Sequence, residues 1–159
     1  MAKQDFPALL AIGFHPMTIG QMRATLVSSF QSSKTRPMIM DGFERLVNRL
    51  NEDKIEGQFW IDGSFLTKKT EPEDADVLLL IDGDFYEKAS TAQKVLIDWF
   101  GWRKADVKKD YYCHAFVHFV HKPHHREYSD SVWYNAYWLR QFGFGHNDGA
   151  KGIATFQFP

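Results

Sequence analysis

The sequence has 159 residues, of which 44% are apolar and 25% are charged, with 20 acidic and 19 basic side chains. That length fits one domain around a single core. The formal net charge of −1 argues against a general binder of phosphate backbones, which carries a clear basic surplus, and leaves only a local basic patch open. The single cysteine, Cys113, excludes an internal disulfide and a cysteine-rich zinc site.

The chain carries no recognisable membrane or export signal. Its first residues lack the long apolar run of a signal peptide, and no stretch reaches the roughly 18–20 apolar residues of a membrane span. We therefore expect a cytoplasmic protein with no membrane partner. We also expect one domain over residues 1–159, with two N-terminal helices within residues 18–51, a core over residues 58–120, and a C-terminal helix and short strand over residues 130–158.

Helical patterns dominate the first third of the chain. Residues 13–16 predict a break and a turn, because they contain a glycine and a proline. Thr18 and Gln21 then match a capping box, in which the hydroxyl and the amide satisfy free N–H groups at a helix start, and they predict a helix over residues 19–30. An Arg–Pro pair and apolar residues at helical spacing predict a second helix over residues 36–51.

The remaining two thirds alternate between strands and helices. Four segments rich in β-prone residues predict strands at residues 58–61, 74–81, 112–120 and 152–158. A second capping box, at Ser90 and Gln93, opens a helix that extends to about residue 100, and another helix is expected over residues 130–142. This order predicts an α/β (α+β) domain with a small mixed β-sheet flanked by helices.

The segment that carries chemistry joins the first two predicted strands. Gly63 and Ser64 end one strand in a turn, and Asp74 and Asp76 open the next strand about ten residues later. Residues two apart in a strand point to the same side, and two adjacent carboxylates repel unless a cation lies between them, which suits magnesium. Gly63 lets backbone N–H groups approach a phosphate, and Ser64 adds a hydroxyl donor. The alternative is an ordinary turn followed by a strand with solvated acids at its mouth.

This pattern of apolar–Gly–Ser, then Asp–x–Asp–apolar, resembles the signature of the polymerase-beta-type nucleotidyltransferase superfamily. The chain is also similar, over nearly its whole length, to an uncharacterised family of small bacterial and phage-encoded proteins in that superfamily. The segments that carry this similarity are residues 10–18, Arg36, residues 60–64, residues 72–76, residues 137–144 and residues 151–153.

The resemblance implies a minimal nucleotidyltransferase fold and two-metal chemistry. Asp74 and Asp76 would hold Mg²⁺ or Mn²⁺, and a third carboxylate would come from the next strand. The implied reaction transfers a nucleoside monophosphate from a nucleoside triphosphate, with ATP as the expected substrate, to a hydroxyl on RNA or protein. The small members of the superfamily further imply a toxin–antitoxin or phage-defence setting and a cognate protein partner.

One position departs from the family pattern. His114 stands where the similar proteins place the third aspartate, and Asp110 would substitute for it if the strand began later. A neutral imidazole is a poor magnesium ligand, but it suits manganese or zinc and can itself act as a base. Three hypotheses follow: an active enzyme whose catalytic residues are Asp74, Asp76 and His114; a catalytically degenerate fold acting as a nucleotide-binding, regulatory or protein-interaction module; and a purely structural interaction protein.

Several basic residues are candidates for phosphate contacts. Lys68 and Lys69 lie between the two halves of the motif, where they would meet a triphosphate or remain solvated. Arg140 and Lys151 flank a glycine-rich loop and match the family's terminal pattern, which suits structure or nucleotide binding. Arg36 is either a helix-start residue or a phosphate contact.

Histidines and aromatic residues gather in the last third of the chain. Five of the seven histidines lie between His114 and His125, and we expect a strand-facing pair followed by solvated loop residues. The alternative is that the loop contacts the substrate. The aromatic residues between positions 133 and 138 fall on one helical face, so we expect them to pack in the core rather than to form a base-stacking platform. Cys113 is expected to be a small buried hydrophobe.

Overall fold

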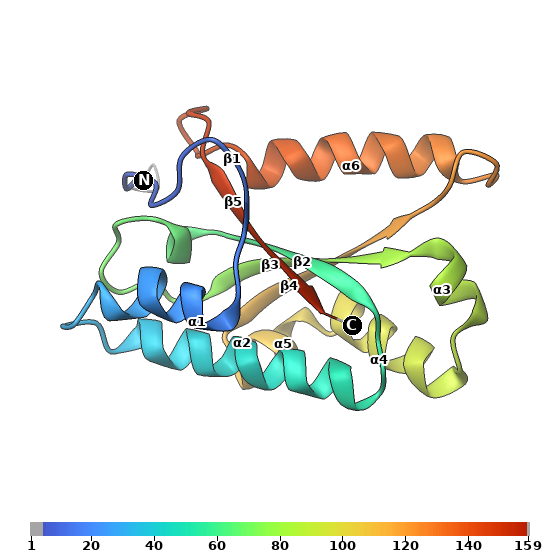
Figure 1. The fold of residues 1–159 in the computed structure, drawn as a ribbon, viewed down its shortest axis with the longest axis horizontal. Helices are drawn as coiled ribbons and strands as arrows, with labels where there is room; N and C mark the ends of the chain where they lie inside the picture. The colour runs from blue at the N-terminus through green and yellow to red at the C-terminus, as the bar shows by residue number, and fades with distance from the viewer. Residues whose placement is uncertain (1–4, 159) are drawn as a thin grey trace.

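A computed structural model of the protein describes residues 5–158 (Figure 1). In chain order the elements are β1 (Gly13–Pro16), α1 (Ile19–Met22), the π-helical η1 (Arg23–Ser28), α2 (Thr35–Glu52), β2 (Gly57–Asp62), the 3₁₀ turn η2 (Ser64–Leu66), β3 (Ala75–Asp82), α3 (Gly83–Lys88), α4 (Thr91–Trp102), α5 (Lys104–Tyr111), β4 (Cys113–Val120), α6 (Tyr128–Phe142) and β5 (Gly152–Phe158). The mixed sheet with flanking helices confirms the predicted fold class. No helix within residues 5–158 is both long enough and apolar enough to cross a membrane.

The described strands form one mixed sheet in the order β1-β5-β2-β3-β4. The outer pairs, β1 with β5 and β3 with β4, run parallel, whereas β2 is antiparallel to both of its neighbours. The end of β2 therefore meets the starts of β3 and β4 at one edge of the sheet. The register places Asp62 opposite Asp76, and Asp76 opposite His114.

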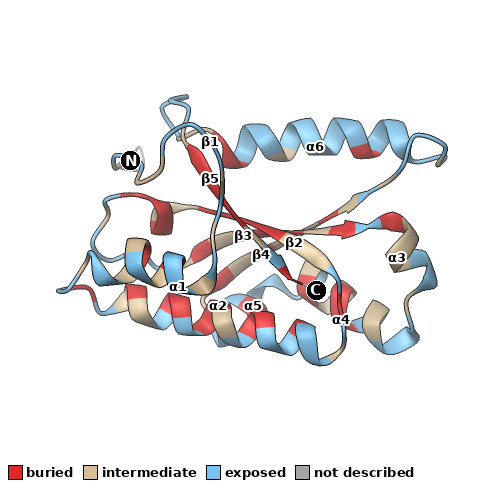
Figure 2. Ribbon diagram, in the orientation of Figure 1, coloured by how far each residue is buried: buried red, intermediate tan, exposed pale blue. Residues whose placement is uncertain are grey.

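The two faces of the sheet are covered unequally. Figure 1 shows α1, α2, α4 and α5 on one side of the sheet and α6 alone on the other. The larger core fills the first side and includes side chains such as Leu46, Phe59 and Phe100. The smaller core beneath α6 consists of Trp60, Leu78, Phe142 and Ile153, with Trp138 packed against it. Figure 2 accordingly shows buried residues along the sheet and α2, whereas most of α6 is exposed.

Local patterns located most of the elements. Both predicted capping boxes are present: Thr18 accepts a hydrogen bond from the Gln21 N–H, and Ser90 accepts one from the Gln93 N–H. The predicted helix over residues 19–30 is wrong in detail, because α1 ends at Met22 and the chain continues as a π-helix to Ser28.

Three elements are absent from the sequence-based prediction. The segment predicted as a turn forms β1, which exists only because it pairs with β5 at the far end of the chain. The short helices α3 and α5 were also missed; each buries a single residue, Gly83 and Val107 respectively, so neither has a clear apolar stripe.

The prediction that the aromatic residues of α6 pack in the core is wrong for three of the four. Trp133 is 62% exposed, Tyr137 is 41% exposed and Tyr134 is also exposed, whereas Trp138 packs on Phe116. The rings of Trp133 and Tyr137 stack on each other with centroids 5.9 Å apart. The reason is architectural: among the described residues no further element covers the outer face of α6 (Figure 1), so only one side of the helix meets the sheet.

Arg36, at the start of α2, is fully buried. Its guanidinium donates hydrogen bonds of 2.6–3.2 Å to four backbone carbonyls, those of Leu26, Phe65, Thr67 and Lys69. Burial lowers the pKa of Arg36 to about 10, a change that the charge of Glu71 partly opposes, so the group stays ionised at neutral pH. Of the two sequence interpretations, the structural one holds, because the guanidinium binds the chain itself.

Glu71, in the loop between η2 and β3, binds the N-terminus of α2. Its carboxylate accepts hydrogen bonds from the backbone N–H groups of Lys34 and Thr35 and from the Thr35 hydroxyl. These donors lower the pKa of Glu71 to about 2. A distant acidic residue thus caps a helix whose own N-cap residue, Lys34, forms no side-chain cap.

We expect Arg36→Met to lower the free energy of unfolding by at least about 3 kcal/mol, because each buried carbonyl left without a donor costs about 1–3 kcal/mol. Urea denaturation followed by circular dichroism measures this change. The matched control is Arg45→Met, on an exposed position of the same helix with one hydrogen bond to the Asp110 carbonyl. Equal stability of the two variants would contradict the role assigned to Arg36.

Candidate active site

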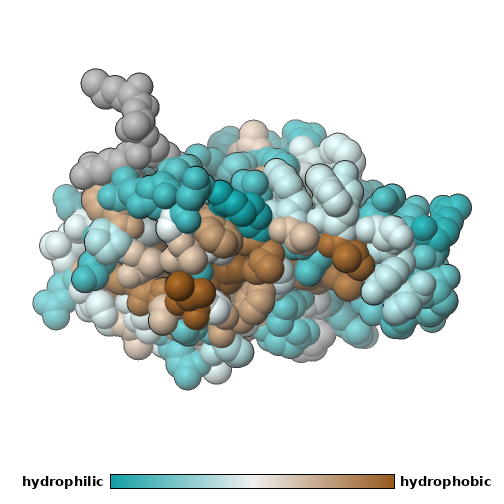
Figure 3. All heavy atoms as spheres, turned by 90° about the horizontal axis from the view of Figure 1, so that it is seen from above, coloured by the Kyte–Doolittle hydropathy of each residue, from teal (hydrophilic) through white to brown (hydrophobic). Residues whose placement is uncertain are grey.

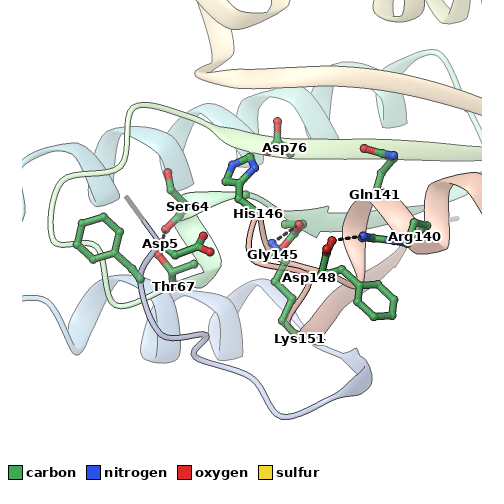
Figure 4. A pocket seen from close by; sticks show the side chains of 14 residues that line it. Asp5, Ser64, Thr67, Asp76, Arg140, Gln141, Gly145, His146, Asp148 and Lys151 are labelled. Carbon is green, nitrogen blue, oxygen red and sulfur yellow. Dashed lines mark hydrogen bonds and ion pairs between the residues drawn. The ribbon is translucent and has the colours of Figure 1, made fainter. Parts of the chain in front are cut away.

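A cavity of about 460 Å³ opens at the sheet edge where β2 ends and β3 begins (Figure 4). We call it the Asp76 pocket. Its wall combines the motif turn with the end of α6 and the loop that leads to β5. The residues used below are Asp62, Gly63, Ser64, Asp76, Arg140 and Lys151.

The Gly63–Ser64 turn requires glycine at its first position. Gly63 has φ +84° and ψ −165°, a conformation open essentially only to glycine. A Cβ on Gly63 would lie 2.5 Å from Oδ2 of Asp76, so the Asp76 carboxylate packs directly against the turn. Ser64 begins η2 and lines the pocket.

Asp76 and His114 lie side by side on neighbouring strands. Nδ1 of His114 is 3.1 Å from Oδ1 of Asp76, and both side chains are partly exposed. His114 therefore stands beside the motif acid, at the position where the resemblance implies a third carboxylate. Asp110 cannot replace it, because Asp110 lies on α5 and lines a separate surface hollow with Arg45.

Asp62 is the site residue that the sequence motif did not single out. It directly precedes Gly63, but its place beside Asp76 follows only from the β2–β3 register. Its carboxylate is buried and forms a 2.7 Å ion pair with Nζ of Lys151, while Oδ1 is buried without a hydrogen-bond partner within the described part of the chain. Burial raises the pKa of Asp62 to about 6, and the attraction of Lys151 only partly offsets this.

Asp74 has a different neighbour from the one expected. It lies just before β3, and its Oδ2 is 2.7 Å from Nζ of Lys108 on α5. This contact raises the pKa of Lys108. Asp76 lines the pocket and Asp74 does not, so the two acids of the motif are not presented together to one cavity. The acid that accompanies Asp76 is Asp62.

The basic candidates divide in the same way. Lys151 lines the pocket, as does Arg140, whose guanidinium pairs with Asp148 and lies 4.6 Å from the centre of the Phe144 ring. Lys68 and Lys69 do not line the pocket. The Lys68 N–H donates to Pro7, and the Lys69 carbonyl accepts from Arg36.

The charges around the pocket favour a cation. Among residues 5–158, four carboxylates line it, those of Asp5, Asp62, Asp76 and Asp148, against the two cations of Arg140 and Lys151. Both cations are already paired with a carboxylate. A polyphosphate entering alone would meet net repulsion, whereas a divalent ion held by carboxylates and phosphate oxygens would relieve it.

Two further residues of β4, Cys113 and His118, are buried and have structural roles. Cys113 is fully buried, which confirms its interpretation as a small hydrophobe, and burial raises the pKa of its thiol. His118 is also buried, and burial lowers its pKa, so the ring is neutral at neutral pH.

Comparison with known proteins identifies one family. The model of the family of unknown function DUF6932 matches residues 4–157. The chain belongs to this family. No curated protein and no solved structure matches the chain. The match to DUF6932 includes every residue of the Asp76 pocket named above, from Asp5 to Lys151.

We expect Gly63→Ala to destabilise the fold by about 1–3 kcal/mol, the strain of a non-glycine residue in this conformation, and to displace the Asp76 carboxylate. Urea denaturation measures the first effect. Gly20→Ala is the control, because Gly20 lies in α1 and an added Cβ there has no neighbour closer than 3.9 Å. That change should be neutral or stabilising by up to about 1 kcal/mol. Similar results for both alanines would refute the argument.

Proposed function

We propose that the Asp76 pocket binds a complex of Mg²⁺ or Mn²⁺ with a nucleoside triphosphate, ATP being the first choice. The protein would then transfer a nucleoside monophosphate to a hydroxyl on RNA or protein. The observation that carries the proposal is the contact between the Gly63–Ser64 turn and the Asp76 carboxylate at the wall of one cavity. A phosphate-binding turn and a metal-binding acid are thus adjacent, as a metal–triphosphate ligand requires.

The size and charge of the cavity support this ligand. A volume of about 460 Å³ lies within the range of small-molecule sites. Asp76, and Asp62 once ionised, would hold the metal, which would stabilise negative charge on the phosphates during transfer. Ser64 and Lys151 would contact the phosphate oxygens, and the Lys151 ammonium would remain paired with Asp62.

The proposed reaction is a nucleotidyl transfer from the bound triphosphate to an acceptor hydroxyl. The acceptor hydroxyl attacks the α-phosphorus, the bond from that phosphorus to the bridging oxygen breaks, and pyrophosphate leaves with the bond's electron pair. The hydroxyl proton passes to Asp76, and Nδ1–H of His114, 3.1 Å away, donates the hydrogen bond that orients this carboxylate.

Calorimetric titration of ATP tests the binding step. We expect heat of binding in the wild type only when Mg²⁺ or Mn²⁺ is present, because the pocket alone repels polyphosphate. Asp76→Asn should abolish this heat. The control is Asp110→Asn, which removes an acid of the separate hollow on α5 and should bind like the wild type. Absence of binding by folded wild-type protein, or equal binding by Asp76→Asn, would overturn the proposal.

Two contacts favour a second candidate function: a catalytically degenerate nucleotidyltransferase fold that serves as a nucleotide-binding, regulatory or protein-interaction module. His114 occupies the position implied for the third carboxylate, and Asp74 is neutralised by Lys108. Either change weakens metal binding without closing the pocket. In both functions a cognate protein partner and a toxin or phage-defence setting remain part of the proposal.

Label transfer from ATP radiolabelled at the α-phosphate separates the two functions. Under the enzyme proposal, the wild type labels an RNA or protein acceptor, and Asp76→Asn lowers the rate about 10²- to 10⁴-fold, as expected for loss of a proton-transfer group. Under the module proposal, the wild type binds ATP without forming product. A gain of product in His114→Asp alone would show that the missing carboxylate had disabled the site.

A further inference from the structure

The turn between β4 and α6 holds a second group of side chains able to bind a metal. One ring nitrogen each of His121 and His125 and one carboxylate oxygen of Glu127 lie within 4.8 Å of one another. Across residues 5–158 this is the only set of three such side chains with that spacing. The imidazoles are largely sheltered, with side chains 10% and 15% exposed, and their rings stack with centroids 4.1 Å apart.

His121 is held in place from two sides. Its backbone N–H donates a 3.0 Å hydrogen bond to the hydroxyl of Ser131, a buried residue of α6. Its ring lies against the start of α3, where a Cβ on Gly83 would be 2.2 Å from Nδ1. With Nδ1 pressed against Gly83, Nε2 is the nitrogen left to face a ligand, and it lies 3.3 Å from Oε2 of Glu127.

The hydrogen bonds of His125 define which of its nitrogens carries the lone pair that a metal can bind. The backbone N–H of Glu127 donates to Nδ1 at 3.1 Å, so Nδ1 carries a lone pair and the neutral ring has its proton on Nε2. Nε2–H in turn donates to Oε1 of Glu87 on α3, at 3.0 Å. An imidazole with one nitrogen on a carboxylate and a lone pair on the other is the arrangement commonly found for a metal-bound histidine.

We propose that His121, His125 and Glu127 bind a divalent transition-metal ion, with zinc the best match, and that Glu87 orients His125 as its carboxylate partner. Two imidazoles and a carboxylate are a favourable zinc donor set, with a water molecule in the fourth position. Zinc bonds of about 2.1 Å place tetrahedral ligands about 3.4 Å apart, close to the 3.3 Å between Nε2 of His121 and Oε2 of Glu127. On binding, Nδ1 of His125 exchanges its backbone hydrogen bond for the metal.

The ion has a structural role in this position. It joins the end of β4 to the start of α6 and, through Glu87, to α3. Within the described chain α6 is the lone helix on its face of the sheet (Figure 1), and the face seen from above has a band of apolar atoms across its middle (Figure 3). Fixing the start of α6 therefore restrains the helix that covers the smaller core. The site lies at the opposite end of α6 from Arg140 and does not depend on the function proposed for the Asp76 pocket.

Zinc titration of chelator-treated protein tests the site by calorimetry. We expect one ion per chain in the wild type, affinity lower by more than about 100-fold in His125→Ala, and affinity lower by about 10- to 100-fold in Glu87→Gln, which loses only the orienting carboxylate. His124→Ala, an exposed histidine of the same turn outside the cluster, should bind like the wild type. Asp76→Asn should also bind normally, which separates this site from the Asp76 pocket.

Two further measurements show whether a loss of zinc binding reflects the site itself or misfolding of the variant. Cobalt bound to the wild type should show the visible absorption of a tetrahedral ion, and zinc should raise the thermal unfolding temperature of the wild type and of His124→Ala but not of His125→Ala. No zinc binding by the wild type, equal binding by His125→Ala and His124→Ala, or loss of binding in Asp76→Asn would each overturn the proposal.

Discussion

The buried guanidinium of Arg36 is the interaction on which the candidate site depends. Backbone carbonyls removed from water need a hydrogen-bond donor, and Arg36 supplies one to each of Phe65, Thr67 and Lys69 in the loop that joins β2 to β3. The planar, five-donor geometry of arginine suits several carbonyls at once, which a lysine ammonium does not. Glu71 binds the start of α2 from the same loop. The loop between the glycine turn and Asp76 is therefore held to α2, although its sequence is polar and irregular.

The register of the strands then places the side chains at the two ends of this loop beside each other. Because β2 and β3 are antiparallel and β3 and β4 parallel, Asp62, Asp76 and His114 become neighbours across three strands. The burial of Asp62 costs solvation, and Lys151 offsets part of that cost, leaving a carboxyl whose pKa is raised to about 6. The excess of carboxylates over free cations explains why a metal ion is part of any nucleotide ligand we propose.

The single helix α6 links the two sites. Arg140, near its end, lines the Asp76 pocket, whereas Glu127, just before its start, belongs to the histidine cluster. Only a small core holds the helix to the sheet, and its outer aromatic residues are exposed. A helix with so few apolar contacts gains most from restraint at its ends, which is the role we infer for the cluster.

Local sequence patterns were sufficient for features that depend on neighbouring residues. The two capping boxes, the strands β2 to β5 and the glycine turn each follow from residue types within a few positions of one another. The sequence by itself therefore determined the fold class and singled out Gly63, Ser64 and Asp76 of the candidate site, and the family resemblance added Arg140 and Lys151. Tertiary structure decided the rest. The pairing of β1, the place of Asp62 beside Asp76, the capture of Asp74 by Lys108 and the exposed aromatic face of α6 all depend on register and on which faces are covered. These are contacts between segments that are distant in the sequence, so no local sequence pattern predicts them.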